Sequence, residues 1–207
     1  MKRPTQNRSD SVRQLVPPDL VDRCKSGDEA AWKELVELTH REVYTLCLRI
    51  LNDPGDAAEA TQDAYLKAWR GLKGFRGDAQ FTTWLYRVAS NAAISKHRSR
   101  KRRRVHEVGV EDELLSGMAA PGSVEATAEI RRDVRELEAA IRNLPDHYRS
   151  AVVLRDVYGM SIAEISKELK ITETAAKVRV HRGRKKLKEA IYGEGSEGRP
   201  RPDPQKR

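Results

Sequence analysis

The side chains that most often carry out catalysis show no catalytic pattern in this chain. The five histidines are scattered, and none has the HExxH spacing of a zinc protease. The chain also lacks the GxSxG motif of a serine hydrolase and the P-loop that binds nucleotide phosphates. Carboxylates are plentiful, but no two mark a convergent pair, and no ligands group into a metal site. The sequence therefore predicts no catalytic site, no metal and no cofactor.

The strongest binding pattern lies in residues 161–187, where two helices are expected around a tight turn. Ser161 and Glu164 have the spacing of a capping box, and Thr172 can cap the second helix. That helix has an inward stripe of small and aliphatic residues, namely Ala176, Val180, Gly183 and Leu187. Its opposite face carries Thr174, Lys177, Val178, His181, Arg182 and Lys185. The pattern predicts a helix-turn-helix whose cationic helix enters a DNA major groove, although surface cations also occur without such a role.

A second pattern joins aromatic residues to a basic helix. Only 5% of the chain is aromatic, yet four rings cluster between Tyr65 and Tyr86, namely Trp69, Phe75, Phe81 and Trp84. Asn91 and the basic run 96–104 follow. Aromatic faces stack on unstacked bases and cations hold the backbone. For Trp69 and Trp84 burial in a helical core is the favoured interpretation. Burial explains Phe75 less well, because it lies in a glycine-rich loop.

Acidic residues gather on the helix that precedes this aromatic cluster. Asp56, Glu59 and Asp63 share that helix with Gln62, and Asp56 is expected to cap its start. The acids form either a solvated face or a docking patch for a basic partner helix. The sequence alone leaves both interpretations open.

The composition indicates a basic protein with modest cores. Charged residues make up 34% of the chain and hydrophobic residues 38%, and the net charge is +9. This balance favours a polyanionic partner, either nucleic acid or an anionic membrane surface. Cys24 and Cys47 have no CxxC partner and are expected to be buried free thiols in a reducing cytoplasm. The polar N-terminus has no signal peptide, and no apolar run approaches the roughly 20 residues of a membrane span.

Helical periodicity dominates between two polar ends, and no segment alternates as a strand would. Helices are expected around residues 32–50 and 56–72, and a third from near Thr82. The fold class is therefore all-α, with two small helical domains joined by a flexible acidic linker. The expected boundaries are a disordered tail at 1–17, a first domain at 18–104, the linker at 105–124, a second domain at 125–192 and a second tail at 193–207.

Several stretches resemble the extracytoplasmic-function (group 4) sigma factors of the sigma-70 family. DAAEATQDAYLKAWR at 56–70 resembles the polymerase-docking helix of region 2. FRGD at 75–78 with FTTWLYRVASN at 81–91 is similar to the promoter-melting segment. Three further stretches are similar to region 4, namely LPDHYR at 144–149, LRDVYGMSIAEI at 154–165 and HRGRKKL at 181–187. The resemblance covers about residues 19–104 and 125–192.

The chain departs from the family pattern within the helix-turn-helix. Lys170 occupies a turn position at which the family often has glycine. Residues 174–178 replace a common Gly-Thr-Val and the serine that follows it.

The resemblance implies roles for residues in both domains. The residues expected to bind polymerase are Glu59, Gln62, Asp63 and Lys67. The residues expected to bind and melt the −10 element are Phe75, Arg76, Trp84, Tyr86, Asn91, Lys96, Arg98 and Arg100. The residues expected to bind the −35 element are Thr174, Lys177, Val178, Arg179, His181, Arg182 and Lys185. A base flipped from the non-template strand would occupy the loop from Phe75 to Gln80, near Asn91.

The resemblance also implies the partners. These are the clamp helices and flap of core RNA polymerase, promoter DNA and an anti-sigma factor, with no small-molecule substrate. Such a protein is a cytoplasmic polymerase subunit without catalytic activity of its own, and an anti-sigma factor can hold it at the membrane. Its acidic linker would thread the polymerase channels. Two other classes stay open. One is an ordinary helix-turn-helix regulator that dimerises through its first domain, and the other is a nucleic-acid-processing enzyme with a helical domain.

Overall fold

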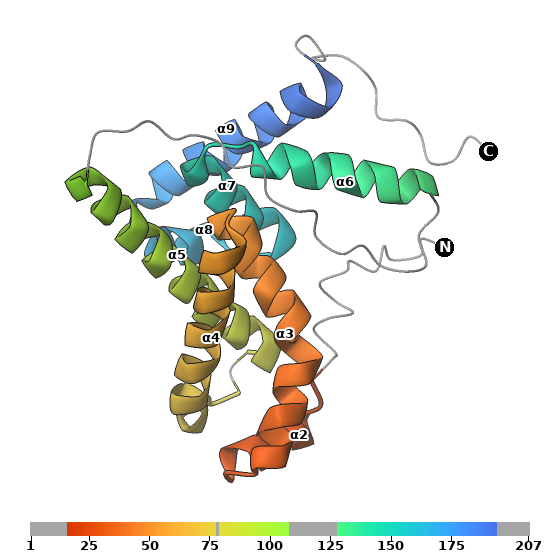
Figure 1. Ribbon diagram of the computed structural model, residues 1–207, viewed down its shortest axis with the longest axis vertical. Coiled ribbons are helices and arrows are strands. Elements are labelled where there is room, and N and C mark those ends of the chain that lie inside the picture. The colour runs from red at the N-terminus through yellow and green to blue at the C-terminus, as the bar shows by residue number, and fades with distance from the viewer. Residues whose placement is uncertain (1–15, 78, 108–127, 194–207) are drawn as a thin grey trace.

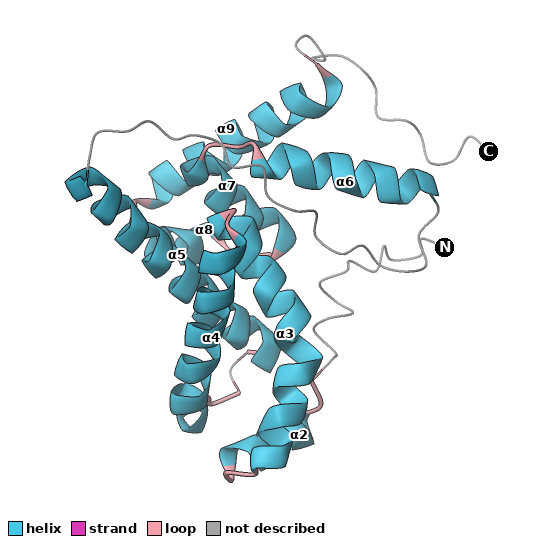
Figure 2. Cartoon of the chain, viewed as in Figure 1, coloured by secondary structure: helices cyan, strands magenta, loops and turns pink. Residues whose placement is uncertain are grey.

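The computed structural model describes residues 16–77, 79–107 and 128–193 (Figure 1). These residues form eight α-helices and no β-strand, which confirms the predicted all-α class (Figure 2). The first group of helices is α2 (Pro18–Lys25), α3 (Glu29–Leu51), α4 (Pro54–Gly71) and α5 (Phe81–Glu107), with a short 3-10 turn at Leu72–Gly74. The second group is α6 (Ala128–Arg142), α7 (Asp146–Val152), α8 (Ile162–Leu169) and α9 (Glu173–Tyr192), with a π-helical turn η2 at Val153–Val157. The expected tails and linker lie largely outside the described residues, although α5 runs to Glu107.

The short sequence Asn52-Asp53-Pro54 separates α3 from α4. Asn52 ends α3 in the left-handed conformation at φ 54°. The Asp53 carboxylate then caps α4 by accepting a hydrogen bond from the backbone N–H of Asp56 at 2.8 Å. The prediction that Asp56 caps this helix was wrong, because Pro54 is already a favoured first helical residue and places the cap one residue before it.

Small side chains bring the helices of the first domain together. Helix α4 packs on both α3 and α5 through four alanines that have no exposed surface, namely Ala57, Ala60, Ala64 and Ala68. Leu35, Leu46 and Leu85 fill the space between the three helices. A buried hydrogen bond of 2.8 Å joins Thr39 to the hydroxyl of Tyr65, and burial raises the pKa of Tyr65 to about 12. The domain is thus a tightly packed bundle with its long polar side chains outside.

A buried arginine fixes the turn between α6 and α7. The guanidinium of Arg149 donates to the carbonyls of Arg142 at 3.1 Å and Leu144 at 2.9 Å, and it pairs with Asp146. Arg142 is the last residue of α6, where helical acceptors lack intrahelical partners, and Leu144 lies in the turn that follows. Arg149 therefore connects the two helices, which the sequence pattern alone did not indicate.

The helix-turn-helix forms as the sequence predicts. Ser161 and Glu164 make the reciprocal capping box of α8, and Thr172 caps α9 through the N–H of Ala175 at 3.1 Å. Between the helices Lys170 adopts φ 50° and ψ 52°. Glycine is the usual residue in this left-handed conformation because it has no Cβ to strain the backbone. Lys170 thus adopts the left-handed conformation that glycine usually supplies at such a turn.

Gly183 allows α9 to approach α7 closely. A Cβ at this position would lie 2.5 Å from Cγ2 of Val152 and 3.3 Å from Cβ of Tyr148. Both distances are shorter than ordinary van der Waals contact, so any larger residue must push α9 away from α7.

We expect Gly183→Ala to destabilise the protein by about 1–2 kcal/mol, since overpacking outweighs the better helix propensity of alanine. Urea unfolding followed by circular dichroism measures this loss. Gly74→Ala is the control, because a Cβ there meets nothing within 4 Å, and it should change stability by less than about 0.5 kcal/mol. Equal stability of the two variants would contradict the close packing of α9.

Candidate nucleic-acid interface

Helix α9 presents a cationic face to solvent. Its inward residues Ala176, Val180 and Gly183 are buried against the second domain. The residues predicted for the opposite face are all exposed: Thr174, Lys177, Val178, His181, Arg182 and Lys185. Arg179, the seventh residue assigned to the −35 element, is half-buried and lies near His147, whose pKa is lowered by burial and by the charge of Arg179. Six of the seven residues therefore lie on the exposed face of one helix, and the major groove of B-DNA admits an α-helix.

The predicted aromatic cluster forms at the start of α5. The ring centroids of Phe75, Phe81 and Trp84 lie 5.4 to 5.5 Å apart in pairs. The ammonium of Lys25 on α2 lies 5.2 Å from the Phe75 ring centroid. Phe81 is buried, while Phe75 and Trp84 are half-buried. The cluster anchors the loop after the 3-10 turn and leaves part of two rings accessible.

Trp69 lies apart from this cluster, and its predicted burial was wrong. Its side chain is 40% exposed and meets Trp32 of α3 edge-on at 4.9 Å between centroids. The two rings line an apolar groove of about 730 Å³ between α3 and α4, together with Val36, Tyr44 and Leu66. Sequence reasoning missed this groove because its residues continue the apolar stripe of a core helix.

The residues predicted to bind polymerase share the outer surface of α4. Glu59, Gln62, Asp63 and Lys67 are all exposed, and Gln62 also lines the apolar groove. Glu59 differs from the others because its carboxylate pairs with Lys96 of α5. The structure therefore brings a predicted polymerase contact and a predicted DNA contact together.

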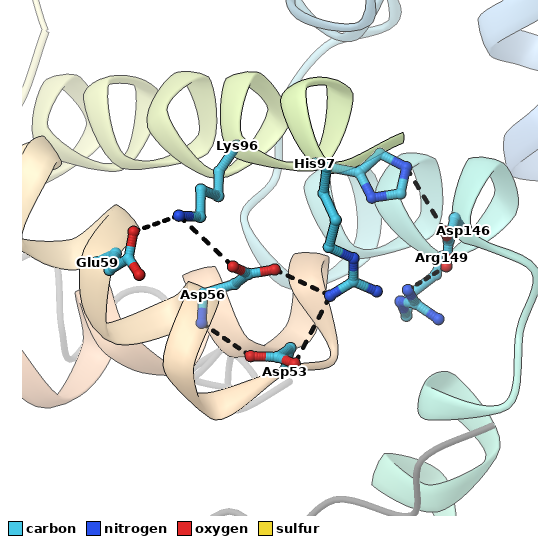
Figure 3. Close-up of polar contacts among 8 residues, drawn as sticks. Asp53, Asp56, Glu59, Lys96, His97, Asp146 and Arg149 are labelled. Atoms are coloured by element: carbon cyan, nitrogen blue, oxygen red, sulfur yellow. Dashed lines mark hydrogen bonds and ion pairs between the residues drawn. The ribbon is translucent and has the colours of Figure 1, made fainter. Parts of the chain in front are cut away.

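Acids of α4 partly neutralise the basic end of α5 (Figure 3). The Asp56 carboxylate lies 2.9 Å from a guanidinium nitrogen of Arg100 and 3.6 Å from the Lys96 ammonium. Arg100 also lies 3.7 Å from Asp53. The side chains of Asp56 and Lys96 are only 17% and 19% exposed. Two of the cations expected to hold phosphates are thus already paired, whereas Lys101 and Arg102 are exposed.

The remaining residues of the −10 group occupy different environments. Arg76 and Asn91 are exposed, and the Glu168 carboxylate accepts a hydrogen bond from Asn91. Arg98 is half-buried and donates to the Glu168 carbonyl at 3.3 Å. Tyr86 is only 9% exposed and packs edge-on against Tyr158 of the second domain at 5.3 Å. Tyr86 therefore offers no accessible ring to a base in this arrangement.

The described part of the chain contains no group of three or more potential metal ligands. Within the same residues no helix combines the length and apolarity that a membrane span requires. Both cysteines are buried free thiols, as expected. Burial raises the pKa of Cys47 to about 11, so its thiol stays protonated and unreactive at neutral pH.

Comparison with known protein families identifies both domains. Residues 35–103 match sigma-70 region 2, and residues 134–187 match sigma-70 region 4. The RNA polymerase sigma-H factor of Pseudomonas aeruginosa is 32% identical over 83% of this chain and 92% of its own length. The ECF RNA polymerase sigma-E factor of Escherichia coli is 31% identical over 84% of this chain and 93% of its own length. The ECF RNA polymerase sigma factor SigW of Bacillus subtilis is 29% identical over 83% and 94% of the two chains.

Two solved structures share the fold. One is the sigma factor RpoE of Bartonella quintana in complex with the anti-sigma factor NepR, with a TM-score of 0.57, 22% identity and coverage of 77% of this chain and 95% of that one. The other is CnrH in complex with the cytosolic domain of CnrY, with a TM-score of 0.51, 22% identity and coverage of 85% and 97%.

Asp56 should contribute most of the stability of the charged cluster on α4 and α5. We expect Asp56→Asn to cost about 1–2 kcal/mol, because it leaves Lys96 and Arg100 near each other without the carboxylate between them. Thermal unfolding measures the loss. Asp63→Asn on the same helix removes an exposed carboxylate that makes no ion pair within the described residues, and it should be nearly neutral. Similar losses for both variants would show that the cluster is not a stabilising feature.

Proposed function

Because the chain belongs to the extracytoplasmic-function sigma factors of the sigma-70 family, we propose that it directs core RNA polymerase to promoters through its two helical domains. The observation that carries the proposal is the order of the two family matches, region 2 on the first bundle and region 4 on the helix-turn-helix. Residues 18–104 are assigned to polymerase and the −10 element, 105–124 to a linker, and 125–192 to the −35 element. Residues 1–17 and 193–207 are assigned to tails.

The exposed face of α9 is the proposed reader of the −35 duplex. Arginine and lysine recognise guanine edges or phosphates in the major groove, and a hydrophobic residue such as Val178 can contact a thymine methyl group. Arg182 lies among the exposed cations of this face and is our candidate for a base contact. Arg179, being half-buried, is better suited to support the face than to read a base.

The loop that begins at Phe75 is the proposed site of a flipped −10 base, with Asn91 near its polar edge. Extruding a base costs a few kcal/mol, and stacking returns about 1–3 kcal/mol per base. The two nearly cancel, so melting needs no ATP but does need contacts with polymerase. The accessible parts of Phe75 and Trp84, and the cations of α5, support this assignment.

The outer surface of α4 is the proposed docking site for the clamp helices of the largest polymerase subunit. Glu59, Gln62 and Asp63 supply polar contacts, and the neighbouring groove lined by Trp32, Leu66 and Trp69 offers apolar area. Aromatic and polar groups of this kind are common at the centres of protein interfaces. The second domain would contact the polymerase flap.

We further propose a cytoplasmic location, no catalytic activity of the protein itself, and regulation by an anti-sigma factor. One structural relative is bound to an anti-sigma factor, and both relatives are complexes with another protein. Such a partner would cover the polymerase-binding and DNA-binding faces.

Run-off transcription with purified core polymerase and a pooled promoter library tests the proposed function. Discrete new transcripts that depend on this protein would establish sigma activity, and their start sites would reveal both promoter elements. A stable operator complex without polymerase, and no transcript, would favour an ordinary helix-turn-helix regulator. Turnover of DNA or RNA by the isolated protein would favour an enzyme.

The run-off transcripts give the sequence of a −35 duplex for a binding assay. If Arg182 makes a bidentate base contact, Arg182→Ala should weaken binding to this duplex by about 1–3 kcal/mol and relax the sequence preference at one base pair. Fluorescence anisotropy with matched and mismatched duplexes measures both effects. Lys33→Ala is the control, since it removes one exposed positive charge from α3 of the first domain. Equal affinities for the two variants would remove Arg182 from the recognition surface.

A further inference from the structure

Helix α2 supplies a cation to the aromatic cluster at the start of α5. Lys25 is the last residue of α2, and its ammonium lies over the ring of Phe75, 5.2 Å from the ring centroid. Phe81 and Trp84 contact the same ring, with centroid distances of 5.5 and 5.4 Å. The sequence did not assign Lys25 to promoter DNA, because Lys25 and Phe75 are distant in the chain.

The turn that follows α2 is fixed by short-range contacts. Cys24, which precedes Lys25, is buried in the core at 2% exposure. The Arg23 guanidinium donates from Nε to the Asp28 carboxylate at 3.0 Å, and the Ser26 hydroxyl donates to the Arg23 carbonyl at 2.7 Å. Asp28 also caps the start of α3. The backbone of Lys25 is therefore held beside the aromatic cluster, while its four-carbon side chain stays flexible.

The Lys25 ammonium is only weakly neutralised. Within the described residues its ion pair is with Asp22 of the same helix at 3.6 Å, and the Asp22 side chain is 75% exposed. Exposed ion pairs of this kind are weak because water and salt screen them. Lys96 of α5, by contrast, pairs with the carboxylates of both Asp56 and Glu59. Lys25 is therefore the more available of the two cations for a phosphate.

Two more cations flank Phe75 in the chain. Lys73 and Arg76 are both exposed, and Lys73 lies in the 3-10 turn that α2 contacts. Lysine and arginine side chains from two separate segments thus accompany one half-buried ring. Proteins bind single-stranded nucleic acid through the same combination, in which bases stack on aromatic rings and cations follow the phosphate backbone.

The ammonium of Lys25 and a stacked base compete for one face of Phe75. An ammonium is held only weakly over a ring that water can reach, whereas a base stacks on such a ring more strongly. A base that takes this face therefore displaces the ammonium. The flexible lysine side chain can then turn toward the phosphate of the same nucleotide, where a charge-assisted hydrogen bond replaces the contact with the ring.

We propose that Lys25 forms a phosphate subsite beside the −10 pocket. It covers Phe75 in the free protein and pairs with the phosphate of the nucleotide whose base takes its place on the ring. The proposal rests on the proposed function for the identity of that nucleotide as part of the −10 element. A phosphate is the same in every nucleotide, so Lys25 contributes affinity and position and leaves the choice of base to other side chains.

Lys25→Met tests the subsite, because methionine keeps an unbranched apolar side chain against Phe75 and removes the charge. The probe is a short, fluorescein-labelled DNA single strand of random sequence, and fluorescence anisotropy measures its affinity for the full-length chain at several salt concentrations. Lys25→Met should weaken binding about 3- to 10-fold at low salt. It should also reduce the slope of log affinity against log salt by about 0.7, the value for one phosphate of a single strand.

Matched variants separate a contact at Phe75 from a general loss of charge. Lys33→Met removes the same charge from α3, where the Lys33 side chain is 79% exposed and pairs with Glu37 of its own helix. It should weaken binding less than about 2-fold. Lys25→Arg keeps the charge and should retain most of the affinity. Far-ultraviolet circular dichroism confirms that each variant is folded.

A double-mutant cycle with Phe75→Ala locates the phosphate contact at the ring. Without the ring no base is held beside Lys25, so Lys25→Met should weaken binding less than about 2-fold in the Phe75→Ala background. Losses that simply add would show that Lys25 acts as an independent surface cation, and the subsite at Phe75 would be wrong.

Equal affinities and salt slopes for Lys25→Met and Lys33→Met would overturn the subsite. Tighter binding by Lys25→Met would also overturn it, since Lys25 would then only obstruct the ring, and so would the absence of measurable binding by the unmodified protein. The assay needs no promoter sequence, and run-off transcription reports on the proposed function alone. Transcripts without an effect of Lys25 would leave sigma activity in place and remove the subsite, whereas the opposite result would refute sigma activity and keep the single-strand subsite.

Discussion

Narrow stripes of small side chains hold the two helices whose other faces carry the cations. On α9 the stripe is Ala176, Val180 and Gly183, and on α5 it includes Ala89, Ala92 and Ala93. A chain with 34% charged residues has little apolar surface to bury, so close approach of backbones has to replace bulky packing. The long polar side chains are then left for the surface, where nucleic acid and polymerase can be recognised. A substitution that places a larger side chain in one of these stripes moves the helix and with it the cationic face on its other side.

Charge pairing decides which of the surface cations remain available. The carboxylates of α4 hold Lys96 and Arg100, whereas Lys101 and Arg102 stay exposed. Glu59 connects this network to the surface of α4 that we propose docks polymerase, because it pairs with Lys96. A partner that takes Glu59 would release a cation on the helix proposed to bind DNA. The proposed protein-docking and DNA-binding surfaces thus share one small set of ion pairs.

Polar and aromatic contacts join the two domains. Buried residues of both domains belong to one hydrophobic cluster, and Tyr158 of the second domain contacts Arg49 and Tyr86 of the first. Polar contacts of this kind permit relative motion of domains more readily than large apolar interfaces.

The sequence by itself determined most of the helices, the caps of α8 and α9, the helix-turn-helix and the family, because these depend on periodicity, short-range hydrogen bonds and ordered motifs. It also predicted the exposed face of α9, since one helix fixes which residues lie opposite its apolar stripe. Only the tertiary structure decided that Trp69 is exposed in a groove, that Tyr86 is buried between domains, and that Asp56 meets Arg100, a residue 44 positions away. Those outcomes depend on how helices distant in sequence approach each other, and a periodic pattern carries no information about which charged side chains then become neighbours.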